Sequence, residues 1–198
     1  MRLTLRVGLA TSVLLLLATP RAFAEWQIKP SLGVTFGTST NLIDLENAAG
    51  SPHLVVGISS LMLGEVVGVE ADVGYARKFF GSGLLVAGSS ATTVTGNLVV
   101  ALPRRLTQYT LRPYFVGGAG LVHVGIAHPI GGEGLRVDST RPAIDIGGGV
   151  TGFLSRRIGI SWDVRYFRSV GTGEERGLSF GPEQLSFWRA NMALAIRY

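Results

Sequence analysis

The sequence has 198 residues and contains no cysteine, which excludes a disulfide framework and a thiolate metal site. Charged residues are scarce, at 16% of the chain. The basic residues form no run or stripe, so a nucleic-acid-binding surface is not expected. Beyond the first 24 residues, no segment approaches the ~20 consecutive apolar residues of a membrane-spanning helix. Glycine, in contrast, is abundant, with 28 residues.

The first 24 residues have the pattern of a secretory signal peptide. Arg2 and Arg6 form a basic head, an apolar stretch follows through Ala18, and Ala22-Phe23-Ala24 provides an Ala-x-Ala cleavage site. We therefore predict a signal peptide over residues 1–24 and one mature domain over residues 25–198. Three of the five net positive charges come from Arg2, Arg6 and Arg21, which leaves the mature chain at about +2.

The mature chain is dominated by residues that alternate between apolar and polar. From Val67 to Tyr75, one parity is wholly apolar, while the other carries Glu70, Asp72 and glycine. Because successive strand side chains face opposite sides of a sheet, this pattern predicts a strand with one apolar face. Similar runs of about ten residues, the length of a bilayer-crossing strand, occupy 26–36, 93–102, 158–167 and 188–198.

Three further runs complete a set of eight strands. In residues 54–62 and 143–154, the pattern does not decide which of the two alternating sets of side chains faces outward. In residues 109–126, we expect Tyr114, Val116, Val122, Val124 and Ile126 to point outward and His123 inward.

The connections between these strands alternate in length. Residues 37–53, 77–92, 127–141 and 168–186 are long and polar, whereas the connections near residues 63–65, 103–105 and 155–157 are short. Long extracellular loops and short periplasmic turns are typical of outer-membrane barrels. The predicted fold class is therefore all-β, an eight-stranded antiparallel up-and-down transmembrane β-barrel located in the cell outer membrane.

Aromatic residues near the strand ends agree with two interfacial girdles. They are Trp26, Tyr75, Tyr109, Tyr166, Trp188 and Tyr198. A soluble barrel would instead point its apolar face inward, a difference that only a structure can test.

Three segments resemble the small outer-membrane β-barrel superfamily of the OmpA and OmpX type. They are Gly68–Tyr75, Arg112-Pro113-Tyr114 followed by Gly117–Gly120, and Trp162–Phe167. The resemblance covers essentially the whole mature chain. The C-terminal pattern Leu194, Ile196, Tyr198 is also similar to the signal by which the barrel assembly machinery recognises its substrates. The resemblance implies architecture rather than activity.

The polar set of alternating residues along the predicted strands includes charged side chains, which an eight-stranded barrel would enclose. The interior of such a barrel is just wide enough for side chains to fill, and a buried charge must be paired. We therefore expect an interior network of salt bridges and hydrogen bonds that fills the barrel. Its predicted charged members are Glu70, Asp72, Asp163, Arg165 and Arg189; Asn191 shares their inward parity, and Lys29 and Asp145 are further candidates.

Two features that would indicate an enzyme or a cofactor are weak. His53, His123 and His128 have no hydroxyl and carboxylate at a spacing that forms a catalytic set. Gly147–Gly152 matches G-x-G-x-x-G but lies within a predicted strand, whereas a dinucleotide site needs the motif to open a helix. No catalytic residue, metal ligand or cofactor is predicted.

The leading functional hypothesis is a non-enzymatic outer-membrane barrel with a filled interior and a structural or surface-interaction role. Expected partners are outer-membrane lipid and lipopolysaccharide, the barrel assembly machinery and an extracellular ligand of the loops; no nucleic acid is expected. The loop segments 41–44, 78–81 and 173–176 are candidates for such contacts. The alternatives are a narrow channel for ions or small solutes and, third, a lipid-modifying hydrolase based on His53 or His123.

Overall fold

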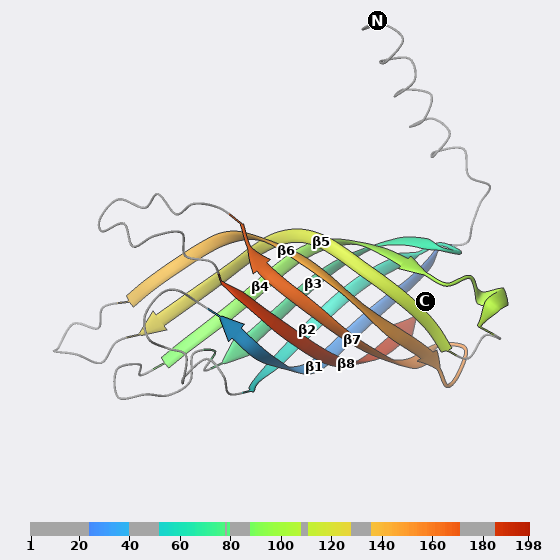
Figure 1. The fold of residues 1–198 in the computed structure, drawn as a ribbon. Coiled ribbons are helices and arrows are strands. Elements are labelled where there is room, and N and C mark those ends of the chain that lie inside the picture. Colours follow the sequence, from blue (N-terminus) through green and yellow to red (C-terminus); the bar gives the residue numbers. More distant parts are fainter. Residues whose placement is uncertain are drawn as a thin grey trace, which may run out of the picture.

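A computed structural model describes residues 24–39, 52–77, 79, 88–107, 111–127, 136–170 and 185–198. Eight strands form one sheet in which every strand is antiparallel to its sequence neighbours, and β1 also pairs with β8 (Figure 1). The strands are β1 (Glu25–Ser39), β2 (His53–Leu63), β3 (Val67–Arg77), β4 (Gly88–Ala101), β5 (Leu111–Ala127), β6 (Arg136–Phe153), β7 (Ile158–Ser169) and β8 (Ser186–Arg197). This closed barrel confirms the predicted fold class.

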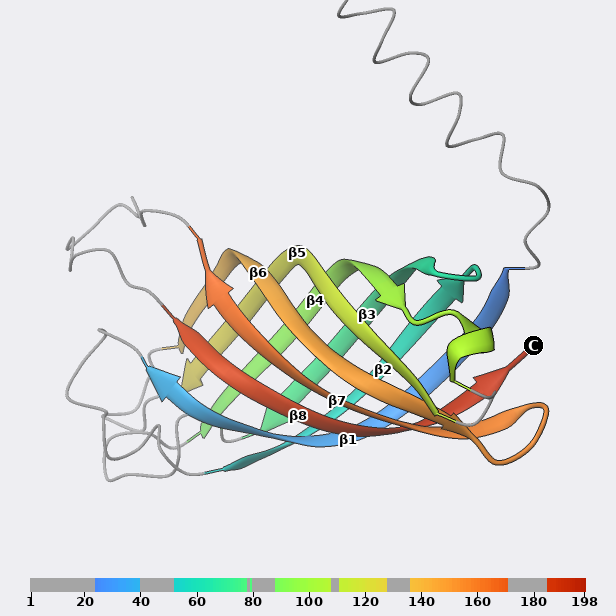
Figure 2. The ribbon, with the colours of Figure 1, turned by 45° about the vertical axis from the view of Figure 1, so that its right-hand side comes forward.

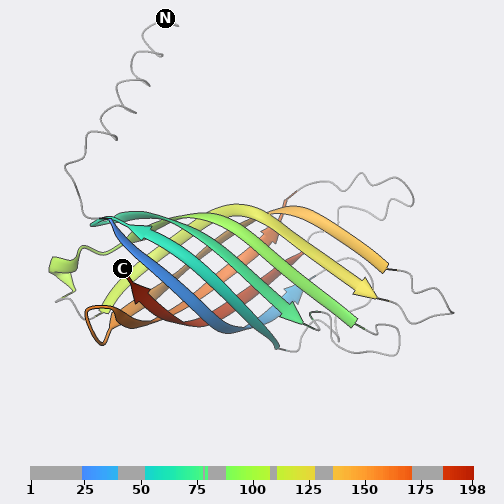
Figure 3. The same cartoon turned by 180° about the vertical axis from the view of Figure 1, so that it is seen from behind.

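The two ends of the barrel differ in their connections. At one end, here named the turn end, β2–β3, β4–β5 and β6–β7 are joined by residues 64–66, 102–110 and 154–157. The 3-10 helix η1 (Arg104–Leu106) lies there, as does the C terminus (Figure 2). The opposite end, the loop end, holds the other four connections (Figure 3). Among the described residues, no helix has the length and apolar composition needed to cross a membrane.

The seam between the first and last strands closes at the turn end. The backbone N–H of Tyr198 donates to the carbonyl of Trp26 at 2.9 Å, and the rings of these two residues lie 6.1 Å apart. On the same outer surface, nearer the loop end, the rings of Tyr166 and Trp188 are 5.1 Å apart. These two exposed aromatic pairs therefore lie near opposite ends of the strands, as expected of two girdles, while Tyr109 lies outside the described residues.

The polarity of the barrel is the reverse of that of a soluble protein. On β3, Val69 is 58% exposed on the outside, whereas Glu70 and Asp72 are 3% and 4% exposed and face the interior. The same alternation holds along β7, where Trp162 is outward and Arg165 inward. An apolar exterior around a polar interior is the arrangement of a transmembrane barrel. The outward direction of the apolar face therefore favours a membrane protein over a soluble barrel.

The direction predicted for the side chains of β5 was wrong. Tyr114, Val116 and Val122 are 5%, 2% and 2% exposed and face the interior, while His123 is exposed on the outside. Apolar residues occupy both parities of this strand, so hydropathy alone could not choose a face. The inward frame is stabilised by Arg112, whose guanidinium donates to the carbonyls of Leu102, Gly64 and Glu65 at the turn end.

Several strands are longer than predicted. β4 begins at Gly88, within the expected loop 77–92, and β6 begins at Arg136, within the expected loop 127–141. The β5–β6 ladder continues from the apolar part of the barrel through the pair Ala127 and Arg136. The connection between β4 and β5 is also longer than the tight turn expected there. Residues 1–23 of the predicted signal peptide lie outside the described residues, as do loop residues 41–44, 78, 80–81 and 173–176.

Candidate functional site

The polar interior is centred on Arg165, which β7 points into the barrel. Arg165 is 1% exposed, and its guanidinium donates from Nη1 to Glu70 Oε1 at 2.7 Å and from Nε to Asp163 Oδ1 at 3.2 Å. Glu70 also accepts from Asn97 Nδ2 at 3.2 Å, and Asp163 accepts from the hydroxyl of Tyr114 at 3.1 Å. The cluster therefore connects strands from opposite sides of the barrel through charge-assisted hydrogen bonds.

A second ion pair lies one layer nearer the loop end. Arg189, which is 2% exposed, donates from Nη2 to Asp72 Oδ2 at 2.5 Å and from Nη1 to Thr93 Oγ1 at 3.0 Å. Its guanidinium carbon lies 4.7 Å from the centroid of the Phe167 ring. Both arginines thus have carboxylate partners, and together these two clusters contain all five residues predicted for the network.

Glycines on the inner face make room for these large side chains. A Cβ atom at Gly74 would lie 2.4 Å from Arg189 Nη1, and one at Gly149 would lie 2.8 Å from the Cζ of Tyr114. Because both approaches are closer than van der Waals contact allows, any larger residue must displace the arginine or the tyrosine. The glycine-rich segment of β6 is therefore explained by packing within a strand rather than by a nucleotide.

Apolar layers lie on both sides of the polar layer, although the turn-end layer comes from β2, β4 and β5 and lies beside the polar inward residues Gln27, Thr151 and Ser161. The loop-end layer contains Val55, Ala76, Phe79, Ala91, Val122, Ala143, Phe167, Leu185 and Phe187. The turn-end layer contains Leu61, Leu63, Val99, Ala101, Tyr114 and Val116. The inward residues of β4 illustrate the sequence of layers from the loop end to the turn end: Ala91, Thr93, Thr95, Asn97, Val99 and Ala101.

Aromatic stacking fixes the loop-end layer. The rings of Phe167 and Phe187 are stacked with centroids 5.0 Å apart. Phe79, from the β3–β4 connection, meets Phe187 edge-on at 5.1 Å and is fully buried. A loop residue is therefore packed into the barrel above the ion pairs, a contact that alternation along the strands could not predict.

The other polar residues proposed for the interior have different surroundings. Lys29 is 3% exposed and its Nζ lies 5.1 Å from the centroid of the Tyr114 ring. Asn191 donates to Asp163 at 3.1 Å. Asp145 is 4% exposed, and neither of its carboxylate oxygens has a hydrogen-bond partner in the structure. All three therefore face the interior, but Asp145 remains outside the two ion-pair clusters.

The turn end carries a further polar group that sequence reasoning did not identify. Glu25, at the start of β1, contacts the guanidinium groups of Arg104 and Arg197. The Arg197 guanidinium also lies 3.6 Å from the centroid of the Phe153 ring. Their separation in sequence hid this group, because closure of the barrel brings the first and last strands together.

The histidines give little support to the hydrolase hypothesis. His123 Nδ1 forms a hydrogen bond with Thr140 Oγ1 at 2.8 Å on the exposed outer surface. His53 lies at the start of β2, and His128 lies outside the described residues. Nucleophilic catalysis also needs a third group that orients the base, and among the described residues no carboxylate is hydrogen-bonded to His123. Within the described ranges, no three His, Cys, Asp or Glu residues gather as a metal site would require.

The residues that resemble an assembly signal lie on one face of β8. Leu194 is 45% exposed on the outside, and Tyr198 is 74% exposed at the turn end. Ile196 lies between them with the same parity. This arrangement leaves the three side chains accessible together, and their role in assembly stays a prediction.

Comparison with solved structures shows the same fold in small outer-membrane barrels. Neisserial surface protein A superposes with a TM-score of 0.58 at 12% identity, covering 88% of this chain and 97% of that protein. Ail, the attachment invasion locus protein of Yersinia pestis, has a TM-score of 0.53 at 11% identity over 87% and 99%. The N-terminal barrel domain of Pseudomonas aeruginosa OprF has 0.51 at 14% identity over 88% and 98%. No protein-family profile and no curated protein sequence matches the chain.

These comparisons and the apolar exterior agree on architecture. The chain has the OmpA/OmpX-like barrel fold predicted by the resemblance. An apolar outer face on a closed barrel of this kind is suited to an outer membrane, where the fold's solved examples occur. The chain therefore has the fold and the surface polarity of a transmembrane β-barrel.

Proposed function

We propose that the protein is a sealed, non-enzymatic barrel that anchors and displays its loop end at the cell surface. The observation that carries this proposal is the layered interior, in which paired charges lie between two apolar layers. Such a barrel acts through its surfaces rather than by conducting solutes.

The energetics of the interior argue against the channel alternative. An ion that crosses the barrel must pass Phe167 and Phe187 and then separate Arg165 from Glu70. Breaking a buried ion pair costs about 3–5 kcal/mol, and apolar constrictions oppose conduction by excluding water. Both barriers would have to be removed before a continuous water path existed.

The direction of insertion follows from the asymmetry of the two ends. In outer-membrane barrels the longer connections face the exterior and the short turns face the periplasm, so the loop end is assigned to the cell surface. A signal peptide over residues 1–24 and recognition of Leu194, Ile196 and Tyr198 by the assembly machinery are consistent with this route.

The proposed surface role rests on the loop end. Segments 41–44 and 173–176 would be presented outside, together with the exposed outer pair His123 and Thr140. In the third candidate segment, 78–81, Phe79 is instead buried in the barrel. Among the proteins with this fold, Ail has been solved in complex with a heparin analogue, sucrose octasulfate. That complex supports the idea that a small barrel can present an extracellular binding surface, without identifying a ligand for this chain.

Dye release and surface labelling would test the two parts of this proposal. The folded protein, inserted in vesicles that contain a small fluorescent dye, should release no more dye than protein-free vesicles. A cysteine introduced at residue 175 should react with an impermeant thiol reagent on intact cells, whereas one at residue 156, on the β6–β7 turn, should not. Dye release by the native protein, or the opposite labelling pattern, would contradict the proposal.

A further inference from the structure

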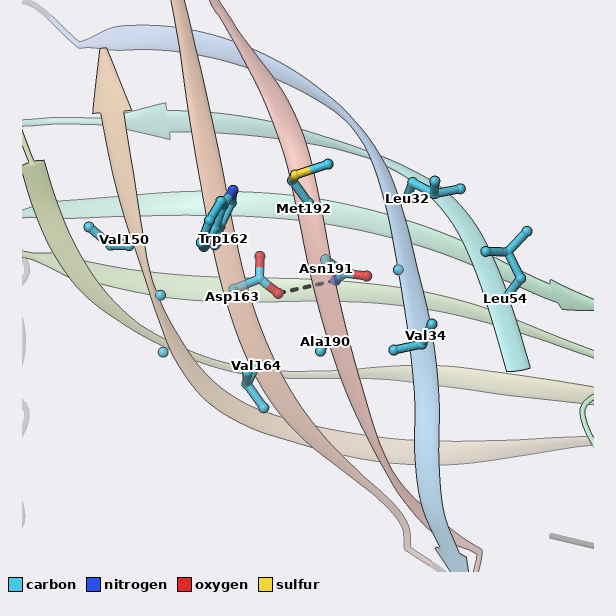
Figure 4. Close-up of a pocket in the computed structure, with 13 residues that line it drawn as sticks. Leu32, Val34, Leu54, Val150, Trp162, Asp163, Val164, Ala190, Asn191 and Met192 are labelled. Atoms are coloured by element: carbon cyan, nitrogen blue, oxygen red, sulfur yellow. Dashed lines mark hydrogen bonds between the residues drawn. The ribbon is translucent and has the colours of Figure 1, made fainter. Parts of the chain in front are cut away.

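The outer surface carries a groove of about 600 Å³ that crosses β6, β7, β8, β1 and β2 (Figure 4). One wall is the outward row Val150, Trp162, Met192 and Leu32, and the other is the row Gly148, Val164, Ala190, Val34 and Leu54. The volume falls within the ~300–1,000 Å³ range of small-molecule sites. The groove is thus a depression in the apolar outer surface.

The rows that form the walls are set by strand register. Trp162 pairs with Met192, which pairs with Leu32, while Val164 pairs with Ala190, which pairs with Val34. Two residues separate the rows along each strand, a distance of ~7 Å. The floor between them is formed by inward-facing residues such as Asp163 and Asn191, which are hydrogen-bonded to each other at 3.1 Å.

The second wall is low because it contains the small residues Gly148 and Ala190. On its other side lies the next outward row, in which Tyr166 contacts Trp188 at 5.1 Å and Trp188 pairs with Phe36. A narrow depression bordered by aromatic and aliphatic side chains fits an extended hydrocarbon chain better than a polar or a bulky ligand.

The groove rises toward the loop end. Val150 is three residues from the end of β6 at the turn end, whereas Leu54 is the second residue of β2 at the loop end. For strands tilted by ~40° and spaced by ~4.8 Å, a line that crosses the four spacings between five strands climbs ~12 Å. This rise is a little less than half of the ~30 Å hydrocarbon core, and so close to the depth of one leaflet.

The upper end of the groove meets a polar rim on β3. Val56 pairs with Tyr75 and Val55 with Ala76, where the β2–β3 ladder ends, and Arg77 and Leu54 are the next residues of the two strands beyond that pair. Tyr75 is 41% exposed, and Arg77 is exposed with the same outward parity. The first wall therefore ends at a phenol and the second at a guanidinium, where the headgroup region of the loop-end leaflet begins.

We propose that the groove binds one acyl chain of lipid A, with a lipid A phosphate at Arg77. The proposal rests on the assignment of the loop end to the cell surface, because the outer leaflet there supplies a phosphorylated, multiply acylated glycolipid. The hydrocarbon chain fills the depression between Trp162 and Ala190, and a guanidinium pairs well with a phosphate. The barrel would then bind one particular lipid at this site, in addition to its non-specific contacts with the surrounding bilayer.

Lipid retention by matched variants tests this site. Ala190→Leu fills the groove, and Ala71→Leu makes the same change at an outward position of β3 that does not line it. Arg77→Gln removes the cation, and Arg156→Gln is its counterpart on the exposed β6–β7 turn. Each protein is extracted from outer membranes in mild detergent, checked for folding by heat-dependent gel mobility, and its bound lipid A and phospholipid are measured by mass spectrometry.

We expect Ala190→Leu to lose its retained lipid A and both control variants to match the native protein. Arg77→Gln should bind lipid A about fivefold more weakly, the equivalent of the ~1 kcal/mol contributed by one basic residue near a charged membrane surface. Equal retention in Ala190→Leu and Ala71→Leu would overturn the proposal, as would retention of phospholipid alone. Neither result would alter the dye-release or labelling outcomes, so failure of this site can be distinguished from failure of the sealed-barrel proposal.

Discussion

The inner and outer faces of the same strands follow opposite rules of stabilisation. On β7, Arg165 is 1% exposed and satisfied by two carboxylates, whereas Val164, one residue away, is 43% exposed on the apolar exterior. The inner face depends on specific partners, while the outer face depends on the absence of charge. Single substitutions on the two faces should therefore lower the stability of the barrel for different reasons, and the change in the free energy of unfolding can be measured for each.

The largest effect is expected inside the barrel. Arg165→Ala leaves Glu70 and Asp163 buried without their cation, and it should lower the free energy of unfolding by about 3–5 kcal/mol. Urea titrations in lipid vesicles measure this change. Arg156→Ala, on the exposed β6–β7 turn, should stay within about 0.5 kcal/mol of the native protein. Equal stabilities of the two variants would mean that the ion pairs of Arg165 do not stabilise the barrel.

A charge on the outer face should cost somewhat less. Val164→Arg places a guanidinium in the hydrocarbon region and should reduce stability by about 2–4 kcal/mol in the same titration. Leu154→Arg, at the turn end, makes a similar change outside the hydrocarbon and should cost about 0–1 kcal/mol. If Val164→Arg were as stable as Leu154→Arg, the assigned lipid-facing frame of β7 would be wrong.

Two glycines compare the faces with a single added methyl group. Gly74→Ala forces the guanidinium of Arg189 to shift, because the new Cβ would lie 2.4 Å from Nη1, and should cost about 1 kcal/mol. Gly96→Ala adds the same atom where nothing lies within 4 Å and should be neutral or slightly stabilising. A Gly96→Ala variant less stable than Gly74→Ala would contradict this assignment of space.

The smallest effect is expected at Asp145. Asp145→Asn removes a buried charge that has no hydrogen-bond partner in the structure, so stability should be unchanged or higher by about 1 kcal/mol or less. Asp72→Asn makes the same chemical change but weakens the pair with Arg189, so it should be clearly destabilising. Vesicle unfolding curves of the two variants, recorded side by side, separate these cases. A loss at Asp145 as large as that at Asp72 would mean that Asp145 has an ionic partner.

Much of the fold could be predicted because, along most strands, one of the two alternating sets of side chains is apolar and the other is polar. On β3 and β7, carboxylates and Arg165 occupy one parity and apolar residues the other, which determines the inner face. On β5, Tyr114 and Val116 are as apolar as their neighbours, so the frame depended on Arg112 and on the hydroxyl contact of Tyr114 with Asp163. Those contacts require knowledge of strands distant in the sequence.

The candidate site divides in the same way. The five charged residues of the interior were identified from parity, but their partners were not, because pairing depends on barrel closure. The apolar layers were missed because inward residues such as Phe187 and Val99 interrupt the polar pattern. The outer groove also depends on register, since Gly148 and Ala190 become neighbours of one depression only after β6, β7 and β8 pair.

The central claim, that the interior is sealed, is tested most directly by single-channel conductance. The mature protein, shown by heat-dependent gel mobility to be folded, would be inserted in a planar bilayer and recorded at both polarities. We expect an electrically silent barrel, because the paired arginines lie between the loop-end and turn-end apolar layers. Steady, discrete current steps from the native protein would contradict it and would make the interior charges part of a conduction path.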